Sequence, residues 1–322
     1  MLEETLASAF LRVTQSATLA AAPWMGQGDR QAPNYAATEA MRKTLAEVDI
    51  VGQVVGGEEE LHQTHSFHIG EKVGSGRGLA VDIAMDAIDG TNLLARGAPN
   101  AVSTIAAAEP GGLLRTPETH MEKLVVGPLP AARVNLNHTT ETNLQIIAEC
   151  LGRKVKDITV IILDRPQNQR LIAEVREAGA RIKLITDGDL SAAIAVGIAG
   201  SEVHAVMGVG GAAEGVIAAA ALRCLGGAIF GRLKPRNAAE SELATRMGID
   251  LQKVYRTDEL ARGEHIIFSV TGITDGDILR GPRYFGGGTR THSLVMTYRT
   301  GTISFVDTVH VEERRALSTF RL

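Results

Sequence analysis

From residue 158 onward the sequence alternates short apolar runs with helix-like segments, and this rhythm constrains the fold more than any other feature of the chain. The predicted strands are 158–163, 181–186, 203–207 and 227–230, and the predicted helices between them are 169–178, 190–199 and 214–224. Strands and helices that alternate at these lengths favour a mostly parallel sheet with helices on both faces.

The remaining segments show a different pattern. Apolar residues recur at spacings of three and four over 6–20 and 36–48, which predicts two amphipathic helices. Short apolar runs predict strands at 50–55, 80–85, 101–107 and 123–126, and hairpin-like strands at 265–270, 293–299 and 302–310. We therefore predict an α/β (α+β) fold with a mixed first sheet and a mostly parallel second sheet flanked by helices. The predicted domains are an α+β domain over 1–156 and an α/β domain over 157–322.

Charge and composition argue against several classes of partner. The chain has 37 Asp and Glu against 33 Lys and Arg, so it lacks the basic surplus that nucleic-acid binding usually requires. The longest apolar run, 216–222, is far shorter than the roughly 20 residues of a membrane span. Cys150 and Cys224 are isolated, which does not suggest a disulfide framework. We expect a cytoplasmic protein that binds neither nucleic acid nor membranes.

An acidic turn follows the predicted strand 80–85. Asp86, Asp89 and Thr91 lie around Gly90, which allows a tight turn at the end of the strand. Mg²⁺ and Mn²⁺ prefer oxygen ligands, and two such ions can activate a water and neutralise charge on a phosphoryl group. The alternative is a solvated acidic turn, because a short motif of this kind also arises without function.

Two further segments place acids beside glycines. Glu58 follows the apolar run that ends at Val55, and Glu214 lies in the glycine-rich segment 208–215, where a strand is predicted to lead into a helix. Backbone amides at such a turn can hold an oxyanion, and the acid can face a cation. These segments favour a metal and phosphate site over a solvated turn.

The turn 86–91 resembles the D-P-[IL]-[DE]-G-T signature of the lithium-sensitive, metal-dependent phosphatase superfamily, which includes inositol monophosphatases and fructose bisphosphatases. Five blocks resemble the class II fructose-1,6-bisphosphatases in particular. They are 69–74, 121–128, 187–189, 210–215 and 268–274. Their order and spacing extend the resemblance over nearly the whole chain.

The resemblance implies hydrolysis of the 1-phosphate of fructose 1,6-bisphosphate to fructose 6-phosphate and phosphate, a step of gluconeogenesis, by a homo-dimer or homo-tetramer that uses Mn²⁺ or Mg²⁺. It implies catalytic roles for Glu58, Asp86 and Thr91, with the Thr91 hydroxyl helping to activate the attacking water. The implied metal ligands are Asn34, Glu58, Asp86, the Ile88 carbonyl, Asp89 and Glu214. The implied substrate-binding residues are Gly90, Thr91, His120, Arg165, Asp187, Gly188, Asp189, Gly211 and Glu214.

Several positions depart from the family pattern. Asn34 occupies the position of a metal-binding Asp, Ala87 that of the signature proline, His120 that of a phosphate-contacting Tyr, and Gln167 that of a second basic residue. The reaction is therefore better defined than the substrate. Two alternatives stay open: a phosphatase for another sugar or inositol phosphate, such as sedoheptulose 1,7-bisphosphate, and a sugar-phosphate-binding homologue of reduced activity.

Two other motifs have simpler explanations. His62, His65 and His68 form an HxxHxxH run, but no Cys or carboxylate completes a zinc set, so a polar surface or a role at the rim of the site is expected. The glycine pattern over 208–213 resembles a dinucleotide fingerprint. The next predicted strand, however, leads to Arg232 instead of the acid that would bind a ribose.

Overall fold

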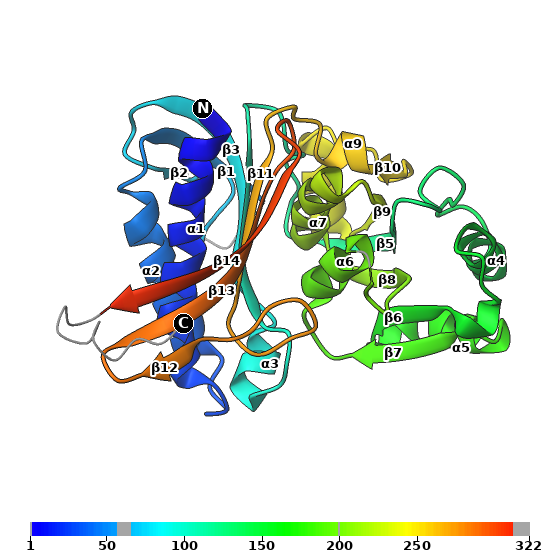
Figure 1. The fold of residues 1–322 in the computed structure, drawn as a ribbon. Coiled ribbons are helices and arrows are strands. Elements are labelled where there is room, and N and C mark those ends of the chain that lie inside the picture. The colour runs from blue at the N-terminus through cyan, green and yellow to red at the C-terminus, as the bar shows by residue number, and fades with distance from the viewer. Residues whose placement is uncertain (1, 57–65, 199, 312–322) are drawn as a thin grey trace.

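The computed structural model describes residues 2–56, 66–198 and 200–311, which form two mixed sheets with helices packed on their faces (Figure 1). The eight-stranded first sheet contains β1 (Ile50–Gly56), β2 (Lys72–Val73), β3 (Leu79–Asp89), β4 (Val102–Ala108), β11 (Ile267–Gly272), β12 (Arg283–Phe285), β13 (Gly288–Thr297) and β14 (Thr302–Val311). The six-stranded second sheet contains β5 (His120–Val126), β6 (Thr159–Leu163), β7 (Arg181–Ile185), β8 (Ala205–Gly211), β9 (Ala228–Lys234) and β10 (Tyr255–Arg256).

The helices are distributed among these strands along the chain. They are α1 (Leu2–Ala21), α2 (Gln31–Leu45), α3 (Thr91–Arg96), α4 (Thr140–Cys150), α5 (Gln169–Glu177), α6 (Asp189–Gly197), α7 (Ala212–Leu225), α8 (Ala238–Arg246) and α9 (Thr257–Leu260). Short 3₁₀ turns occur at Ala22–Trp24, Val155–Asp157 and Pro166–Asn168. Within the described ranges, no helix has both the length and the apolar character to cross a membrane.

The first sheet has the strand order β12-β13-β11-β4-β3-β1-β2, and β14 pairs with β13. β1 and β3 are parallel, whereas β3, β4, β11 and β13 pair antiparallel in turn. Helices α1 and α2 cover one face, where Phe10 and Met41 pack in one buried cluster with Ile83 and Ile105 (Figure 1). The predicted amphipathic helices and the C-terminal antiparallel strands are confirmed.

Helix α7 lies between the two sheets, as Figure 1 shows. Its residues 216–222 are all at most 2% exposed, and they share a core cluster with Phe268 of the first sheet and Val125 of the second. A helix that is covered on both sides must be apolar all round. This explains the long apolar run of the sequence, and it makes α7 the element that joins the two layers.

The second sheet has the order β10-β9-β5-β8-β6-β7. The strands of the predicted βα units, β6 to β9, run in one direction, while β5 lies between β8 and β9 and runs antiparallel to both. The predicted fold class is confirmed, with a second sheet that is mixed because β5 enters its middle. Helices α4 and α5 pack on the face opposite α6 and α7 (Figure 1).

The division between the sheets does not coincide with the predicted boundary after residue 156. β5, which precedes this boundary, belongs to the second sheet, and β11 to β14, which follow it, complete the first. The chain therefore crosses between the layers more than once. As a division into separate domains, 1–156 and 157–322 stays a prediction.

Candidate active site

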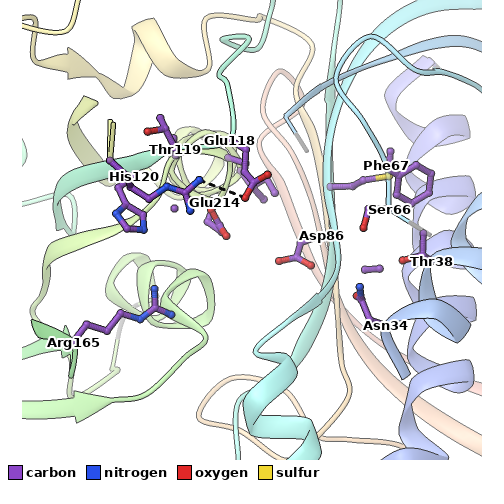
Figure 2. A pocket seen from close by; sticks show the side chains of 17 residues that line it. Asn34, Thr38, Ser66, Phe67, Asp86, Glu118, Thr119, His120, Arg165 and Glu214 are labelled. Atoms are coloured by element: carbon purple, nitrogen blue, oxygen red, sulfur yellow. Dashed lines mark ion pairs between the residues drawn. The ribbon is translucent and has the colours of Figure 1, made fainter. Parts of the chain in front are cut away.

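A cavity of about 280 Å³ is lined by residues at strand ends of both sheets and by helices α2 and α7 (Figure 2). β8 leads into it through Gly211, β6 leads to Arg165, and β9 leads to Arg236. β5 runs the opposite way and begins there, with His120 paired to Gly211 on one side and Lys234 on the other. Ligands of open α/β sheets bind at the carboxyl ends of the strands, and this cavity lies at the carboxyl ends of β6, β8 and β9.

The first sheet and α2 supply one wall of the cavity. Figure 2 shows Asp86, from β3, and Asn34, from α2, on the same side. The Ile88 amide donates to Asp86 Oδ1 over 2.9 Å, and the pairing of β3 with β4 shifts register between Asp86 and Asp89. Asp86 lines the cavity, whereas Asp89, on the other side of this irregularity, is buried.

Gly90 and Gly188 are the points where the acidic turns of the two sheets approach each other. Both have a positive φ, 90° and 77°, which favours glycine, and each begins a helix, α3 or α6. A Cβ on either residue would lie 2.9 Å from Cδ1 of Leu93. Both turns therefore pack against one leucine, and any larger residue would separate them.

Asp89 is the most deeply placed of the acids, with 4% of its surface exposed. Burial raises its pKa well above the usual value, and the charges of Asp86, Asp189, Asp187 and Glu214 raise it further. The two acidic turns and the start of α7 thus bring their carboxylates into one electrostatic cluster.

Glu214 lines the cavity in the first turn of α7, near the middle of the view in Figure 2. Burial raises its pKa, and the positive charge of Lys123 opposes that effect. The Lys123 side chain is 5% exposed, and its Nζ lies 2.8 Å from Asp189 Oδ2. Close packing favours glycine at position 210, because a Cβ there would clash with Asp189 Oδ2 and would lie 3.1 Å from the same Nζ. We had not predicted Lys123 as a site residue, although a lysine within an apolar strand was a usable signal.

The side of the cavity across from Asp86 carries the basic side chains (Figure 2). His120, Arg165 and Arg236 all line it. Burial lowers the pKa of His120, and the charges of Arg236 and Arg165 lower it further, so its imidazole is neutral near pH 7. Arg165 NH2 also lies 3.6 Å from Asp187 Oδ1. Arg236, in the loop between β9 and α8, was not predicted, because nothing in its local sequence indicates that β9 ends beside His120.

The structure places the predicted residues at different depths. The residues that line the cavity are Asn34, Asp86, His120, Arg165, Gly211 and Glu214. Ile88, Asp89, Gly90, Thr91 and Asp189 adjoin it through the turns described above, while Asp187 and Gly188 line a neighbouring cavity of about 270 Å³. Gln167 instead lines a separate cavity of about 800 Å³ beside α4 and α5. Glu58, His62 and His65 lie outside the described residues, and His68 pairs with Glu71.

The donor set fits a hard divalent cation. The cluster contains five carboxylates, those of Asp86, Asp89, Asp187, Asp189 and Glu214, against the cations of Lys123 and Arg165. Partly buried negative charge in this excess needs compensation, and carboxylate oxygens are the ligands that Mg²⁺ and Mn²⁺ prefer. In the described part of the chain, no three His, Cys, Asp or Glu side chains already converge on one point as metal ligands do.

A carboxylate cluster beside a cationic pocket, set between two layered sheets, is the arrangement of a phosphoric monoester hydrolase. Comparison with known proteins makes this specific. Residues 4–310 match the family described as bacterial fructose-1,6-bisphosphatase, glpX-encoded, and the chain belongs to this family.

Curated relatives agree with this assignment. A protein of Synechococcus sp. (strain JA-3-3Ab) is 42% identical over 97% of both chains, and one of Synechococcus elongatus is 41% identical over 96% of this chain and 97% of its own. A protein of Crocosphaera subtropica is 40% identical over 97% of this chain and 98% of its own. All three are named D-fructose 1,6-bisphosphatase class 2/sedoheptulose 1,7-bisphosphatase.

Proposed function

We propose that the protein hydrolyses the 1-phosphate of fructose 1,6-bisphosphate, releasing fructose 6-phosphate and phosphate. One observation carries the proposal: a single cavity is lined by the carboxylates of Asp86 and Glu214 and by the cationic or imidazole side chains of His120, Arg165 and Arg236, with Asp86 on one side and Glu214, His120 and Arg165 across from it (Figure 2). A sugar bisphosphate suits this lining, because one phosphate needs metal ions for hydrolysis and the other needs only cationic binding groups.

Mg²⁺ or Mn²⁺ is the proposed cofactor. Asp86, Asp89, Glu214 and the Ile88 carbonyl would hold the ions, together with Asn34, whose amide oxygen is a weaker ligand, and with Glu58. When bound, such ions activate a water and neutralise the charge that develops on the phosphoryl oxygens. The excess of carboxylates over cations around Asp89 supports this assignment.

The protein's own groups then position the substrate. The first turn of α7, which follows Gly211, presents backbone N–H groups to a phosphate oxygen. Asp187 and Asp189 would accept hydrogen bonds from sugar hydroxyls, and Asn92 and Lys123 fix their carboxylates. The Thr91 hydroxyl, in the first turn of α3, would orient the attacking water.

Sedoheptulose 1,7-bisphosphate is the second candidate substrate. It carries the same two terminal phosphates on a chain longer by one carbon, and the relatives' names include this activity. We further propose that the protein acts in the cytoplasm as a homo-dimer or homo-tetramer, which light scattering on the purified protein would test.

Phosphate release from a panel of substrates tests the function. The panel contains fructose 1,6-bisphosphate, sedoheptulose 1,7-bisphosphate, fructose 1-phosphate and inositol 1-phosphate, each with Mg²⁺, Mn²⁺ or EDTA. We expect release from both bisphosphates that EDTA abolishes and added metal restores. Release from inositol 1-phosphate alone would overturn the substrate assignment, and binding without release from any ester would overturn the enzyme assignment.

A further inference from the structure

We propose that Arg236 is a specificity-determining residue: it joins His120 and Arg165, which the family resemblance already implies as substrate contacts, in binding the phosphate that is not hydrolysed, and it gives the enzyme its preference for sugar bisphosphates over monophosphates. The inference rests on the proposed function and deepens it. No motif identified in the sequence includes Arg236, and its place in the site follows from the topology of the second sheet.

The position of Arg236 depends on how the strands end. His120, the first residue of β5, pairs with Lys234, the last residue of β9, and Arg236 follows two residues later. Arg165 is the second residue after the end of β6 at Leu163. It lies at the same end of the sheet and lines the same cavity. Three segments that are distant in sequence therefore place their polar side chains at one end of the cavity.

The loop that carries Arg236 is held in place before any ligand binds. Asn237 caps α8, and its side chain accepts a hydrogen bond from the Glu240 amide over 2.9 Å. The Glu240 carboxylate in turn accepts hydrogen bonds from the Arg236 amide (2.8 Å), from Arg236 Nε (2.6 Å) and from the Thr119 hydroxyl (2.7 Å). The guanidinium is thus oriented in advance, which reduces the entropy that is lost when it binds an anion.

Glu240 orients Arg236 without using up its donors. A guanidinium carries five N–H donors, and the Glu240 side chain takes only the one on Nε. Arg236 NH2 lies 3.8 Å from Glu118 Oε1, which is an ion pair beyond hydrogen-bond distance. Figure 2 shows Glu118 on the same side of the cavity as His120. A phosphate bound here would compete with Glu118 for the guanidinium. Two parallel guanidinium donors can bind two oxygens of one phosphate, as they can bind a carboxylate.

His120 and Gln167 explain why a further arginine matters in this chain. Gln167, at the position where the resemblance expects a second basic residue, lines a different cavity. His120 is neutral near pH 7 and offers a phosphate one hydrogen bond without a full charge. Arg165 shares its charge with Asp187. Arg236 therefore supplies much of the cationic character that a phosphate dianion needs.

The experiment compares Arg236→Gln with the wild type on two substrates, fructose 1,6-bisphosphate and fructose 1-phosphate. The matched control is Arg246→Gln, an exposed arginine of the neighbouring α8 that pairs with Glu242. The variant loses hydrogen bonds between a charged guanidinium and a phosphate. We therefore expect KM for the bisphosphate to rise by about 10- to 100-fold, with kcat changed much less. We expect KM for the monophosphate, and both constants of the control, to change by less than about twofold. Unchanged melting temperatures would show that both variants fold.

Two further variants separate a binding role from a structural one. Arg236→Lys keeps the charge but loses the paired donors, so we expect it to restore KM only in part. Glu118→Gln removes the competing carboxylate, so we expect it to lower KM for the bisphosphate and to strengthen inhibition by inorganic phosphate. Equal effects of Arg236→Gln on both substrates, or no effect on either, would overturn the inference. Wild-type protein that releases phosphate from neither substrate would instead refute the proposed function.

Discussion

Asn92 donates two hydrogen bonds to one oxygen of Asp187, from its backbone N over 3.2 Å and from its Nδ2 over 3.0 Å. Asn92 lies in α3, which follows β3 of the first sheet, and Asp187 follows β7 of the second sheet. The pair therefore joins the two acidic turns on which the site is built. It also explains how a carboxylate at the end of one sheet is held in register with the turn of the other.

We expect Asn92→Ala to raise KM for the sugar bisphosphate by about tenfold. The variant loses the Nδ2 bond to a charged acceptor, an interaction worth roughly 1.5–3 kcal/mol, and keeps the backbone bond. Steady-state kinetics would measure the change. Gln145→Ala, on the exposed side of α4, is the control and should leave KM unaltered. A normal KM for Asn92→Ala would mean that Asp187 does not need this contact to bind substrate.

We expect Asp86→Asn to lower kcat by about 100-fold or more, since a metal ligand supplies several kcal/mol of transition-state stabilisation. Its fold should persist, because the amide oxygen of an asparagine can still accept the hydrogen bond from the Ile88 amide. Phosphate release and the melting temperature would be measured together. Asp49→Asn is the control, because this aspartate is 70% exposed and pairs with Arg77 away from the cavity. An active Asp86→Asn enzyme would exclude Asp86 from the mechanism.

We expect Asn34→Asp to lower the metal concentration that gives half-maximal activity. The change places a carboxylate beside Asp86 on the same wall of the cavity, and hard cations bind carboxylates more strongly than amides. Without metal the same variant should be less stable than the wild type, because it adds negative charge to the acidic end. Gln31→Glu, on the same helix but outside the cavity, controls for a general charge effect. An unchanged metal requirement would contradict the assignment of Asn34 as a ligand.

We expect metal-free Asp89→Asn to be more stable than the wild type at pH 8, because burial and the neighbouring carboxylates disfavour the charged form of Asp89. A raised carboxyl pKa means that the folded wild type binds a proton that the unfolded chain does not. Its stability penalty is therefore full above the raised pKa, begins to shrink as the pH falls through that pKa, and vanishes below the pKa of the unfolded chain. The advantage of the variant should thus shrink as the pH is lowered from 8.

Urea unfolding in EDTA at several pH values would measure this difference. The comparison must be made between the two proteins, because His120, His204 and His310 have lowered pKa values and destabilise both of them as the pH falls below about 6.5. Added Mg²⁺ or Mn²⁺ should stabilise the wild type more than the variant. A wild type that is the more stable protein without metal at pH 8 would show that the cluster carries no repulsive energy.

Local sequence predicted the elements whose residues carry their own signal. The turn 86–91, the acids at 187–189 and the start of α7 at Glu214 were found because glycines and carboxylates mark strand ends within a few residues. The amphipathic helices α1 and α2 were found because one face of each is buried. The turn at such a strand end is marked by its local residues, even where distant residues also hold it.

What the sequence did not reveal depends on contacts between distant segments. β5 has the same apolar character in either sheet, so its place between β8 and β9 follows only from the assembled fold. Lys123 and Arg236 enter the site because of that placement, which pairs β5 with two strands, β8 and β9, that come much later in the chain. Helices α4 and α8 were not predicted either; the available signals were the capping residues Thr139 and Asn237 and, in α4, the apolar face with Leu144 and Ile147.

The pairing of β4 with both β3 and β11 has a consequence for synthesis of the protein. All seven residues of β4 are buried, and β11, which covers its second edge, begins only at Ile267. A chain emerging from the ribosome must therefore carry an unpaired edge on a strand that is fully buried in the finished fold while more than a hundred further residues are made, and such an edge promotes association with other chains. Truncation before β11 would leave this edge permanently open, so the last part of the chain protects its first sheet from aggregation.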